Sequence, residues 1–513
     1  MNRQKGEVNI FLGIFKVIFI LCLLFLQVWL LFLIYSGAYG LKVYTSTLFS
    51  IIKIVAIIYL IYKPSNPAYK ITWIIVIALL PVLGIVCYVL WGNGTATKKM
   101  RKEREIQSIK ASKYLPKCDL VMNNIKNIDA SKYRQIKYLN DTTMLPVYHN
   151  AEVEYLKIGE DYFKRLLDDL KKASKFIFLE YFIISKSKMW DNIFEVLSQK
   201  SEEGVKVYII TDEFGSLFRL PQDYKKSFNN KNIKTKVFNP ITPIISTHFN
   251  YRDHRKIAVI DGEIAYTGGI NIGDEYINAI NRLGHWKDFG IRITGDSVNS
   301  FSVMFLKMWN TIDYKDNMDY KDFIVFSESI GQGYIFPFSD GPNNNSNSGE
   351  FTYINMINSA KKYVYITTPY FIIDNEMLKA LTVASKSGID VRIVLPSIPD
   401  KKLVFALSRS YYEELLNAGV KIYEYTPGFI HGKLCVADDE VAVVGTINFD
   451  FRSFYLHYEC ATWMYNTGVE TSIREDFMDI VGKSSEISLS NWKKRSLFKK
   501  ILEAILRVFG PLL

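Results

Sequence analysis

Three long apolar stretches dominate the first 92 residues of the chain. They run over Ile10–Tyr35, Val43–Tyr62 and Ile71–Trp91. Each has close to the ~20 residues that a helix needs to cross a bilayer. The pattern predicts a transmembrane anchor of two to three helices over residues 1–92, and it leaves open whether the first stretch spans. A buried hairpin within a soluble core is the alternative interpretation.

After residue 92 the pattern changes. No further apolar run is long enough to span a membrane. Short apolar runs alternate with longer amphipathic segments such as Asp161–Ser174 and Val404–Ala418. This alternation is typical of an α/β layered fold, in which helices flank a sheet. Residues 93–139 are expected to form a linker between the anchor and this part.

The α/β part contains the same stretch twice. HRKIAVIDGEIAYTGGIN spans residues 254–271, and HGKLCVADDEVAVVGTIN spans residues 431–448. The matched pairs, all 177 residues apart, are His254 and His431, Lys256 and Lys433, Asp261 and Asp438, Gly268 and Gly445, and Asn271 and Asn448. Five matches at one offset indicate a duplicated domain. We predict a first copy over residues 140–325 and a second over 326–485.

In each copy the repeated stretch predicts a tight hairpin. Asp-Gly or Asp-Asp lies between two β-rich runs, which favours a hairpin turn, so that Asp261 and Asp438 are expected to shape the turns. Residues two apart on a strand share a face, so the histidine and the lysine point the same way. The returning strand brings Asn271 or Asn448 to the same end. Each copy therefore gathers an imidazole, an ammonium and a carboxamide.

This combination of groups suits a phosphate diester. Lysine supplies a point charge and asparagine supplies N–H donors for the non-bridging oxygens. A neutral histidine can attack phosphorus, and a charged one can protonate a leaving oxygen. Two copies that face each other would place one imidazole on each side of phosphorus. Glu459 and Asp288 are the candidates for orienting the histidines.

The net charge and the cysteine and histidine content indicate which kinds of partner and ligand the chain could bind. A formal charge of +11 favours an anionic partner, either nucleic acid or an acidic lipid surface. The five cysteines form no CxxC pair, and the six histidines are scattered, so no metal site is predicted. Lysines and arginines over 98–104 favour a cytoplasmic location for everything after residue 92. Three spans would then place Arg3 and Lys5 outside, which conflicts with the same rule.

The last part of the chain predicts a basic amphipathic helix within residues 490–513. Leucine, isoleucine and phenylalanine recur on one helical face between Leu497 and Phe509, with lysines and arginines between them. Such a helix is typical of a segment that lies in an anionic membrane interface. Packing against the protein body is the alternative.

At these residues the chain resembles a known family. The two H-x-K-x4-D motifs resemble those of the phospholipase D superfamily, and LPSIPDKKLV (395–404), TPGFIHGK (426–433) and VVGTINFDFRS (443–453) are similar to bacterial cardiolipin synthases. The resemblance implies two tandem phospholipase D-like domains, each a mixed sheet flanked by helices, that face each other in a pseudo-dimer. It adds Asp261 and Asp438 to the catalytic set, and Thr446 to Asn271 and Asn448 as phosphate-binding residues. Gly269 stands where many superfamily members carry serine.

The resemblance also implies a reaction. Two phosphatidylglycerols would give cardiolipin and glycerol through a phosphatidyl-histidine intermediate, without a metal or another cofactor. By analogy, His254 is expected to be the nucleophile and His431 the acid. The expected partners are phosphatidylglycerol, other anionic phospholipids and the membrane, rather than nucleic acid. Hydrolysis of phospholipids, cleavage of nucleic acid and a lipid-binding scaffold without turnover are the alternatives.

Overall fold

The computed structural model describes most of the chain after residue 38. The described residues are 22, 25, 29, 32, 39–92, 98–149, 151–217, 219–220, 232–240, 250–326, 331–342 and 346–512. The first predicted span, Ile10–Tyr35, lies outside the described residues except for four isolated positions. The chain divides into two compact units, one of residues 1–95, 241–250 and 505–513, and one of residues 96–240 and 251–504.

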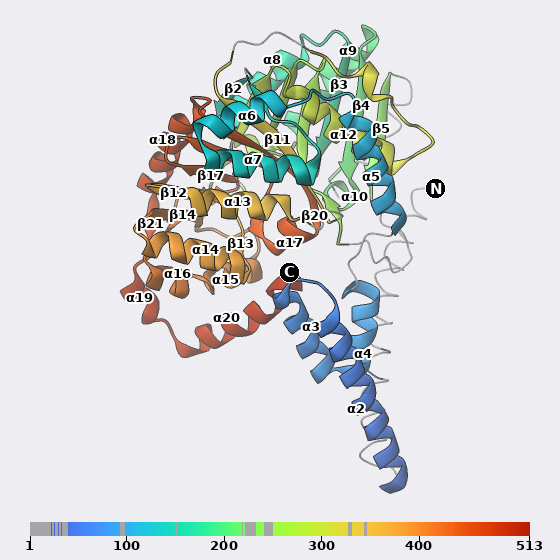
Figure 1. Ribbon diagram of the computed structural model, residues 1–513, viewed down its shortest axis with the longest axis vertical. Coiled ribbons are helices and arrows are strands. Elements are labelled where there is room, and N and C mark those ends of the chain that lie inside the picture. Colours follow the sequence, from blue (N-terminus) through green and yellow to red (C-terminus); the bar gives the residue numbers. More distant parts are fainter. Residues whose placement is uncertain are drawn as a thin grey trace. The chain divides into compact units, whose positions relative to one another are not determined.

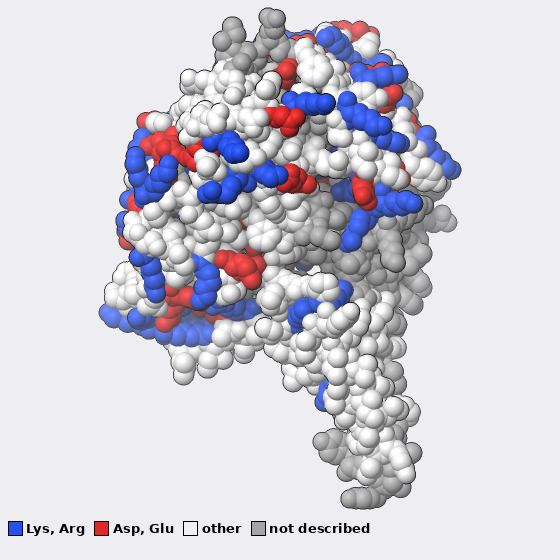
Figure 2. Space-filling view, in the orientation of Figure 1, with Lys and Arg blue, Asp and Glu red and all other residues white. Residues whose placement is uncertain are grey.

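The first unit is helical. Its described helices from the amino-terminal part of the chain are α2 (Tyr39–Tyr62), α3 (Pro67–Leu79), α4 (Pro81–Cys87) and η1 (Tyr88–Gly92). Because proline lacks an N–H donor, Pro81 opens a new helix and divides the third predicted span in two. In Figure 2 the surface over α2 carries almost no charged side chains. Of the helices within the described ranges, none combines the length and the apolar character that a membrane crossing requires.

The second unit contains two large mixed sheets, one for each copy of the repeat (Figure 1). The first sheet has the order β2 (Glu152–Leu156), β10 (Gly290–Thr294), β8 (Ile264–Gly268), β7 (Lys256–Ile260), β3 (Phe176–Tyr181), β4 (Lys206–Asp212), β5 (Ile233–Phe238). The second has the order β1 (Tyr148–His149), β11 (Tyr334–Asp340), β20 (His457–Tyr465), β18 (Val441–Gly445), β17 (Leu434–Ala437), β12 (Tyr363–Thr367), β14 (Asp390–Pro396), β15 (Lys421–Tyr425), β21 (Ser484–Glu486). The predicted α/β fold with two tandem domains is confirmed.

The two predicted hairpins form at equivalent places. β7 and β8 are antiparallel and join through Asp261, while β17 and β18 join through Asp438. Both turns need left-handed backbone, with φ of 56° at Asp261 and 73° at Gly262, and of 60° at Asp438 and 59° at Asp439. Aspartate and glycine tolerate this conformation better than most residues, which explains why they recur there.

Helices cover the sheets. The helices of the first copy are α8 (Gly159–Leu170), α9 (Lys188–Glu202), α10 (Glu213–Ser216), η2 (Asp274–Ile277), α12 (Val298–Ile312) and η3 (Tyr320–Asp322). Those that follow are α13 (Ser348–Ser359), α14 (Asn375–Lys386), α15 (Lys402–Arg409), α16 (Tyr412–Ala418), α17 (Phe451–Tyr455), α18 (Val469–Gly482) and α19 (Leu489–Lys493). Two further helices, α20 (Leu497–Phe509) and η4 (Gly510–Leu512), come last in the sequence, and residues 505–513 belong to the first unit. The amphipathic segment Val404–Ala418 is thus two helices rather than one.

The expected linker over 93–139 is not an extended connection. It contains α5 (Lys98–Ser112), α6 (Asp119–Ile128) and most of α7 (Ala130–Thr143). These helices pack on the sheets: the Gln135 side chain on α7 donates to Ser359 and accepts from the Trp463 indole. Because α5 is polar over most of its length, its packing is not visible in the sequence as an apolar stripe.

Short parallel strands also connect the two copies. β6 (Arg252–Asp253) pairs with the start of β20, and β16 (Gly428–Ile430) pairs with β9 (His285–Lys287). A buried ion pair adds to this connection, since the Lys287 ammonium lies 2.7 Å from Asp476 on α18. In each copy, the short strand just before the histidine therefore pairs with a strand of the other copy.

Candidate active site

His254 is fixed against the second copy. Its backbone N–H donates to the carbonyl of Tyr458 over 2.9 Å, which continues the β6–β20 pairing. The next residue on β20 is Glu459, and both of its carboxylate oxygens lie 2.9 Å from Nδ1 of His254. Glu459 is fully buried. The orienting carboxylate of the first motif thus comes from the second copy.

His431 has the reciprocal arrangement. Its backbone N–H donates to the carbonyl of Lys287 over 2.8 Å, which continues the β16–β9 pairing. Its Nδ1 lies 2.7 Å from Oδ2 of Asp288 in the first copy. Glu459 and Asp288 therefore contact the two imidazoles, but each carboxylate serves the histidine of the other copy rather than of its own.

Burial keeps both imidazoles neutral. It lowers the pKa of His254 well below the usual value of 6.5 and outweighs the opposing effect of Glu459. Burial and the neighbouring Lys433 lower the pKa of His431 to about 4. Burial disfavours ionisation of Glu459, but the contact with His254 prevails and lowers the pKa of the carboxyl group. A neutral imidazole that donates from Nδ1 to a carboxylate leaves a lone pair on Nε2.

The two lysines lie in the same buried site. Burial lowers the pKa of Lys256 to about 8 and that of Lys433 to about 7. Lys433 Nζ lies 3.1 Å from both ring nitrogens of His431. Besides burial, the Lys256 charge lowers the pKa of His254, His431 and Lys433. The charge of one lysine thus acts on the histidines of both motifs.

The two asparagines support the loops beside this site. Asn271 accepts the N–H of Ile183 and donates to the hydroxyl of Tyr276. Asn448 donates to Ser453 over 3.1 Å, and its buried Oδ1 has no hydrogen-bond partner within the described part of the chain. Both carboxamides are almost fully buried. Their role in binding phosphate stays a prediction.

The Thr446 hydroxyl contacts the carboxylate of Glu459, and its expected role in binding phosphate stays a prediction. Its hydroxyl donates to Glu459 over 2.5 Å and accepts the N–H of Cys460. The hydroxyl is therefore occupied in holding the carboxylate that orients His254. Gly269 holds the equivalent position in the first copy, where a Cβ would lie 2.1 Å from Oδ1 of Asp288. Glycine at this position leaves room for the carboxylate.

Asp261 and Asp438 lie at the hairpin turns, away from the histidines. Asp261 accepts the N–H groups of Ser174, Lys175 and Phe176, and Asp438 accepts those of residues 361–363. These bonds fix the start of the neighbouring strand in each sheet. The geometry shows both aspartates at the turns, as their residue type suggested, and the catalytic role implied by the resemblance stays a prediction.

His457 also lies beside His254 and Glu459, although the repeated stretches do not include it. Its Nδ1 lies 3.6 Å from Glu459, and its ring centroid lies 5.5 Å from that of His254. Because His457 and Glu459 are two apart on β20, they share a face, and this spacing was the available signal. The ligand atoms of His254, His457 and Glu459 lie within 4.8 Å of one another, close enough to hold a metal ion.

Comparisons with known proteins identify the family of the chain. The family model described as "Cardiolipin synthase, PLD-like domain" matches residues 166–285 and 353–481, and the model of a phospholipase D-nuclease N-terminal region matches residues 51–93. The chain is 36% identical over 454 residues to cardiolipin synthase 2 of Bacillus anthracis, covering 87% of each chain. It is 43% identical over 466 residues to an uncharacterized protein of Streptococcus mutans, covering 89% of this chain and 99% of that protein.

A solved structure shows the same fold. Phosphatidylserine synthase of Haemophilus influenzae matches with a TM-score of 0.57 and 14% identity, over 75% of this chain and 98% of that one. Fold and site together define a phospholipase D-like enzyme with two copies of its catalytic domain. The chain belongs to the bacterial cardiolipin synthases, and it is a phosphatidyltransferase that makes cardiolipin.

The crowding at Gly269 generates the first prediction. In Gly269→Ala, the new Cβ displaces Asp288, so that His431 loses its orienting bond. We expect cardiolipin formation to fall by about 10²-fold, as for other misplaced catalytic groups, while the thermal midpoint changes little because the displaced group is a side chain. Gly482→Ala, where a Cβ meets nothing within 4 Å, is the control. Full activity of Gly269→Ala would contradict this assignment of Gly269 and Asp288.

The pKa values of the two lysines generate the second prediction. A lowered lysine pKa means that the ammonium form is lost as the pH rises, through about 7 for Lys433 and about 8 for Lys256. Because the ammonium groups attract the anionic substrate, kcat/KM for cardiolipin formation should fall between pH 7 and 9. Measuring kcat/KM in mixed micelles across this range tests the expectation, and a constant value up to pH 9 would refute it.

Proposed function

We propose that this chain transfers a phosphatidyl group from one phosphatidylglycerol to another through a covalent histidine intermediate. The observation that carries the proposal is the pair of buried imidazoles, each bonded at Nδ1 to a carboxylate of the other copy. Two histidines that are each held at Nδ1 by a carboxylate can use Nε2 for nucleophilic attack and for proton transfer at one phosphorus. The two lysines supply the positive charge that a phosphate diester requires.

In the first half-reaction, Nε2 of His254 attacks phosphorus and a P–N bond forms. The bond from phosphorus to the glycerol oxygen breaks, and His431 gives that oxygen a proton, so that glycerol leaves. The anionic phosphate raises the pKa of His431 above its value in the empty site, and Asp288 stabilises the imidazolium. Lys256 and Lys433 neutralise the non-bridging oxygens while the new bond forms.

The second half-reaction reverses these roles. A glycerol hydroxyl of another phosphatidylglycerol attacks phosphorus, and neutral His431 accepts its proton. The P–N bond breaks, and cardiolipin leaves with His254 neutral again. Glu459 holds the His254 ring in place throughout, with the Thr446 hydroxyl fixing the carboxylate. Water could attack the same phosphatidyl-histidine intermediate. Transfer therefore prevails over hydrolysis only when a second lipid occupies the acceptor position.

The substrate is a membrane lipid, and exposed apolar side chains support a location at the membrane. On α2 these include Val55, Ile58 and Ile61, all at least 59% exposed. On α20 they include Leu497 and Phe498, and Figure 2 shows lysines and arginines gathered along α19 and α20. Apolar residues beside basic ones suit an anionic bilayer surface. We place the catalytic domains on the cytoplasmic side of the cell membrane.

Trapping the intermediate tests this proposal. The purified protein is incubated with phosphatidylglycerol labelled with ³²P, quenched and separated from free lipid at a pH that preserves phosphohistidine. We expect His254→Ala to lose the label and to lower turnover by more than about 10⁴-fold. His431→Ala should retain some label while turnover falls by about 10²–10⁴-fold, because proton transfer is lost.

The unreactive His149→Ala, a partly exposed ring on β1, is the control and should behave as wild type. Label that persists in His254→Ala but disappears in His431→Ala would exchange the two roles. Absence of label from the wild type and from both variants, with cardiolipin still produced, would overturn the covalent mechanism.

A further inference from the structure

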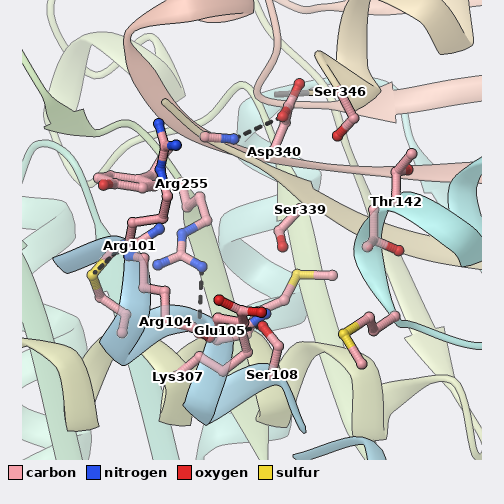
Figure 3. A pocket seen from close by; sticks show the side chains of 16 residues that line it. Arg101, Arg104, Glu105, Ser108, Thr142, Arg255, Lys307, Ser339, Asp340 and Ser346 are labelled. Atoms are coloured by element: carbon pink, nitrogen blue, oxygen red, sulfur yellow. Dashed lines mark hydrogen bonds between the residues drawn. The ribbon is translucent and has the colours of Figure 1, made fainter. Parts of the chain in front are cut away.

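A second polar cavity lies behind the strands that carry the catalytic residues. Its volume is about 320 Å³, and α5, α12, the end of β11 and Tyr458 of β20 line it (Figure 3). Arg255 also lines it, although the neighbours His254 and Lys256 belong to the catalytic site. Side chains alternate along an extended segment, so the cavity faces the side of this segment away from the imidazole.

Positive charge gathers at one end of the cavity. Figure 3 shows Arg101, Arg104 and Lys307 there, with Arg255 and the carboxylate of the exposed Glu105 close by. Arg255 has carboxylate partners, since it contacts Glu180 and Asp253. Within the described ranges, no carboxylate oxygen lies within 4.0 Å of the other three cations. Nε of Arg104 is buried and has no hydrogen-bond partner there.

Neighbouring positive charge disfavours the charged forms of Lys307 and Arg104. Burial together with Arg104 and Arg255 lowers the pKa of Lys307 to about 7. Burial lowers the pKa of Arg104 as well, and the charge of Arg255 adds to this effect. Cζ of the Arg104 guanidinium lies 3.5 Å from the centre of the Tyr458 ring. This stacking holds the N–H donors of the guanidinium in place. Buried cations without a counter-charge are costly, and a bound anion would remove the cost.

The opposite end of the cavity is suited to hydroxyl groups. Asp340 lies there and accepts the N–H groups of Gly341 and Gly349, which hold its carboxylate in place. Ser339, Thr142 and Ser346 add hydroxyl groups, and Figure 3 shows Asp340 and Ser346 at this end. Carboxylate and hydroxyl oxygens accept hydrogen bonds from hydroxyl donors. A ligand with a phosphate at one end and hydroxyl groups at the other would match both ends of the cavity.

We propose that this cavity binds the phosphate ester of a small polyol, with the phosphate on Arg101, Arg104 and Lys307 and the hydroxyls toward Asp340. The ligand is either a free polyol phosphate or the headgroup of a glycerol-bearing phospholipid. The site is separate from the catalytic site, and its existence does not depend on the proposed mechanism. Arg255 and Tyr458 connect the two, because each is next in sequence to a catalytic-site residue.

Direct binding tests the proposal with the full-length protein in detergent. Radiolabelled glycerol 3-phosphate is the free probe and labelled phosphatidylglycerol in mixed micelles is the lipid probe, both measured by equilibrium binding in a His254→Asn background that stops turnover. In Arg101→Gln/Lys307→Met we expect at least tenfold weaker binding of one probe and one fewer bound molecule per chain. The catalytic site contributes equally to all proteins and cancels in the comparison.

The matched control is Lys102→Gln/Lys315→Met, which removes the same charges from exposed positions near the same elements. It should bind both probes within twofold of the parent. Loss of the glycerol 3-phosphate site identifies a free ligand, and loss of only the lipid site identifies a headgroup. If the double variant does not fold, Lys307→Met alone is used. Unchanged stoichiometry and affinity for both probes in the cavity variant would overturn the proposal.

Discussion

The site depends on one kind of contact between the two copies: each catalytic histidine is bonded to a carboxylate of the other copy. Glu459 of the second copy bonds the imidazole of His254, and Asp288 of the first copy bonds that of His431. The parallel pairings β6–β20 and β9–β16 bring these groups together by ordinary backbone hydrogen bonds. Neither His254 nor His431 takes its orienting carboxylate from its own copy, so the site requires both copies of the domain.

Burial determines the protonation state of the two histidines that these carboxylates contact. In water, a histidine beside a carboxylate would gain a proton more easily, but here desolvation dominates and both rings stay neutral. The same desolvation makes the two lysine ammonium groups costly, so the empty site is electrostatically prepared for an anion. The cavity behind Arg255 follows the same principle on the other side of the catalytic segment, where buried cations again lack a counter-charge.

Much of the fold could be predicted from the sequence, because it rests on local rules. The single offset between the two motifs revealed the duplication, and the Asp-Gly and Asp-Asp pairs marked the hairpins through their left-handed backbone. The carboxylates Glu459 and Asp288 were found from the need to fix a tautomer. Their crossed pairing was not predictable, because it depends on strands of two or three residues that have no sequence pattern of their own.

Other contacts could not be foreseen for similar reasons. The contact of Thr446 with Glu459 was not predicted, because tertiary distances that no motif encodes decide which group a buried hydroxyl contacts. The packing of α5 to α7 was not predicted either, because only a few apolar side chains on them, such as Ile125 and Ile136, are fully buried. His457 has no counterpart in the first copy, so the duplication did not point to it, although its spacing from Glu459 places both on one face of β20.

The crossed pairing itself can be measured most directly by ¹⁵N NMR of the full-length protein labelled only at histidine. With His254→Asn and His431→Asn used for assignment, both rings should be neutral at pH 7 with the proton on Nδ1. Glu459→Gln should then shift the resonances of His254 and leave His431 unchanged, and Asp288→Asn should do the reverse. Resonances of His431 that respond to Glu459→Gln while His254 does not would contradict the account.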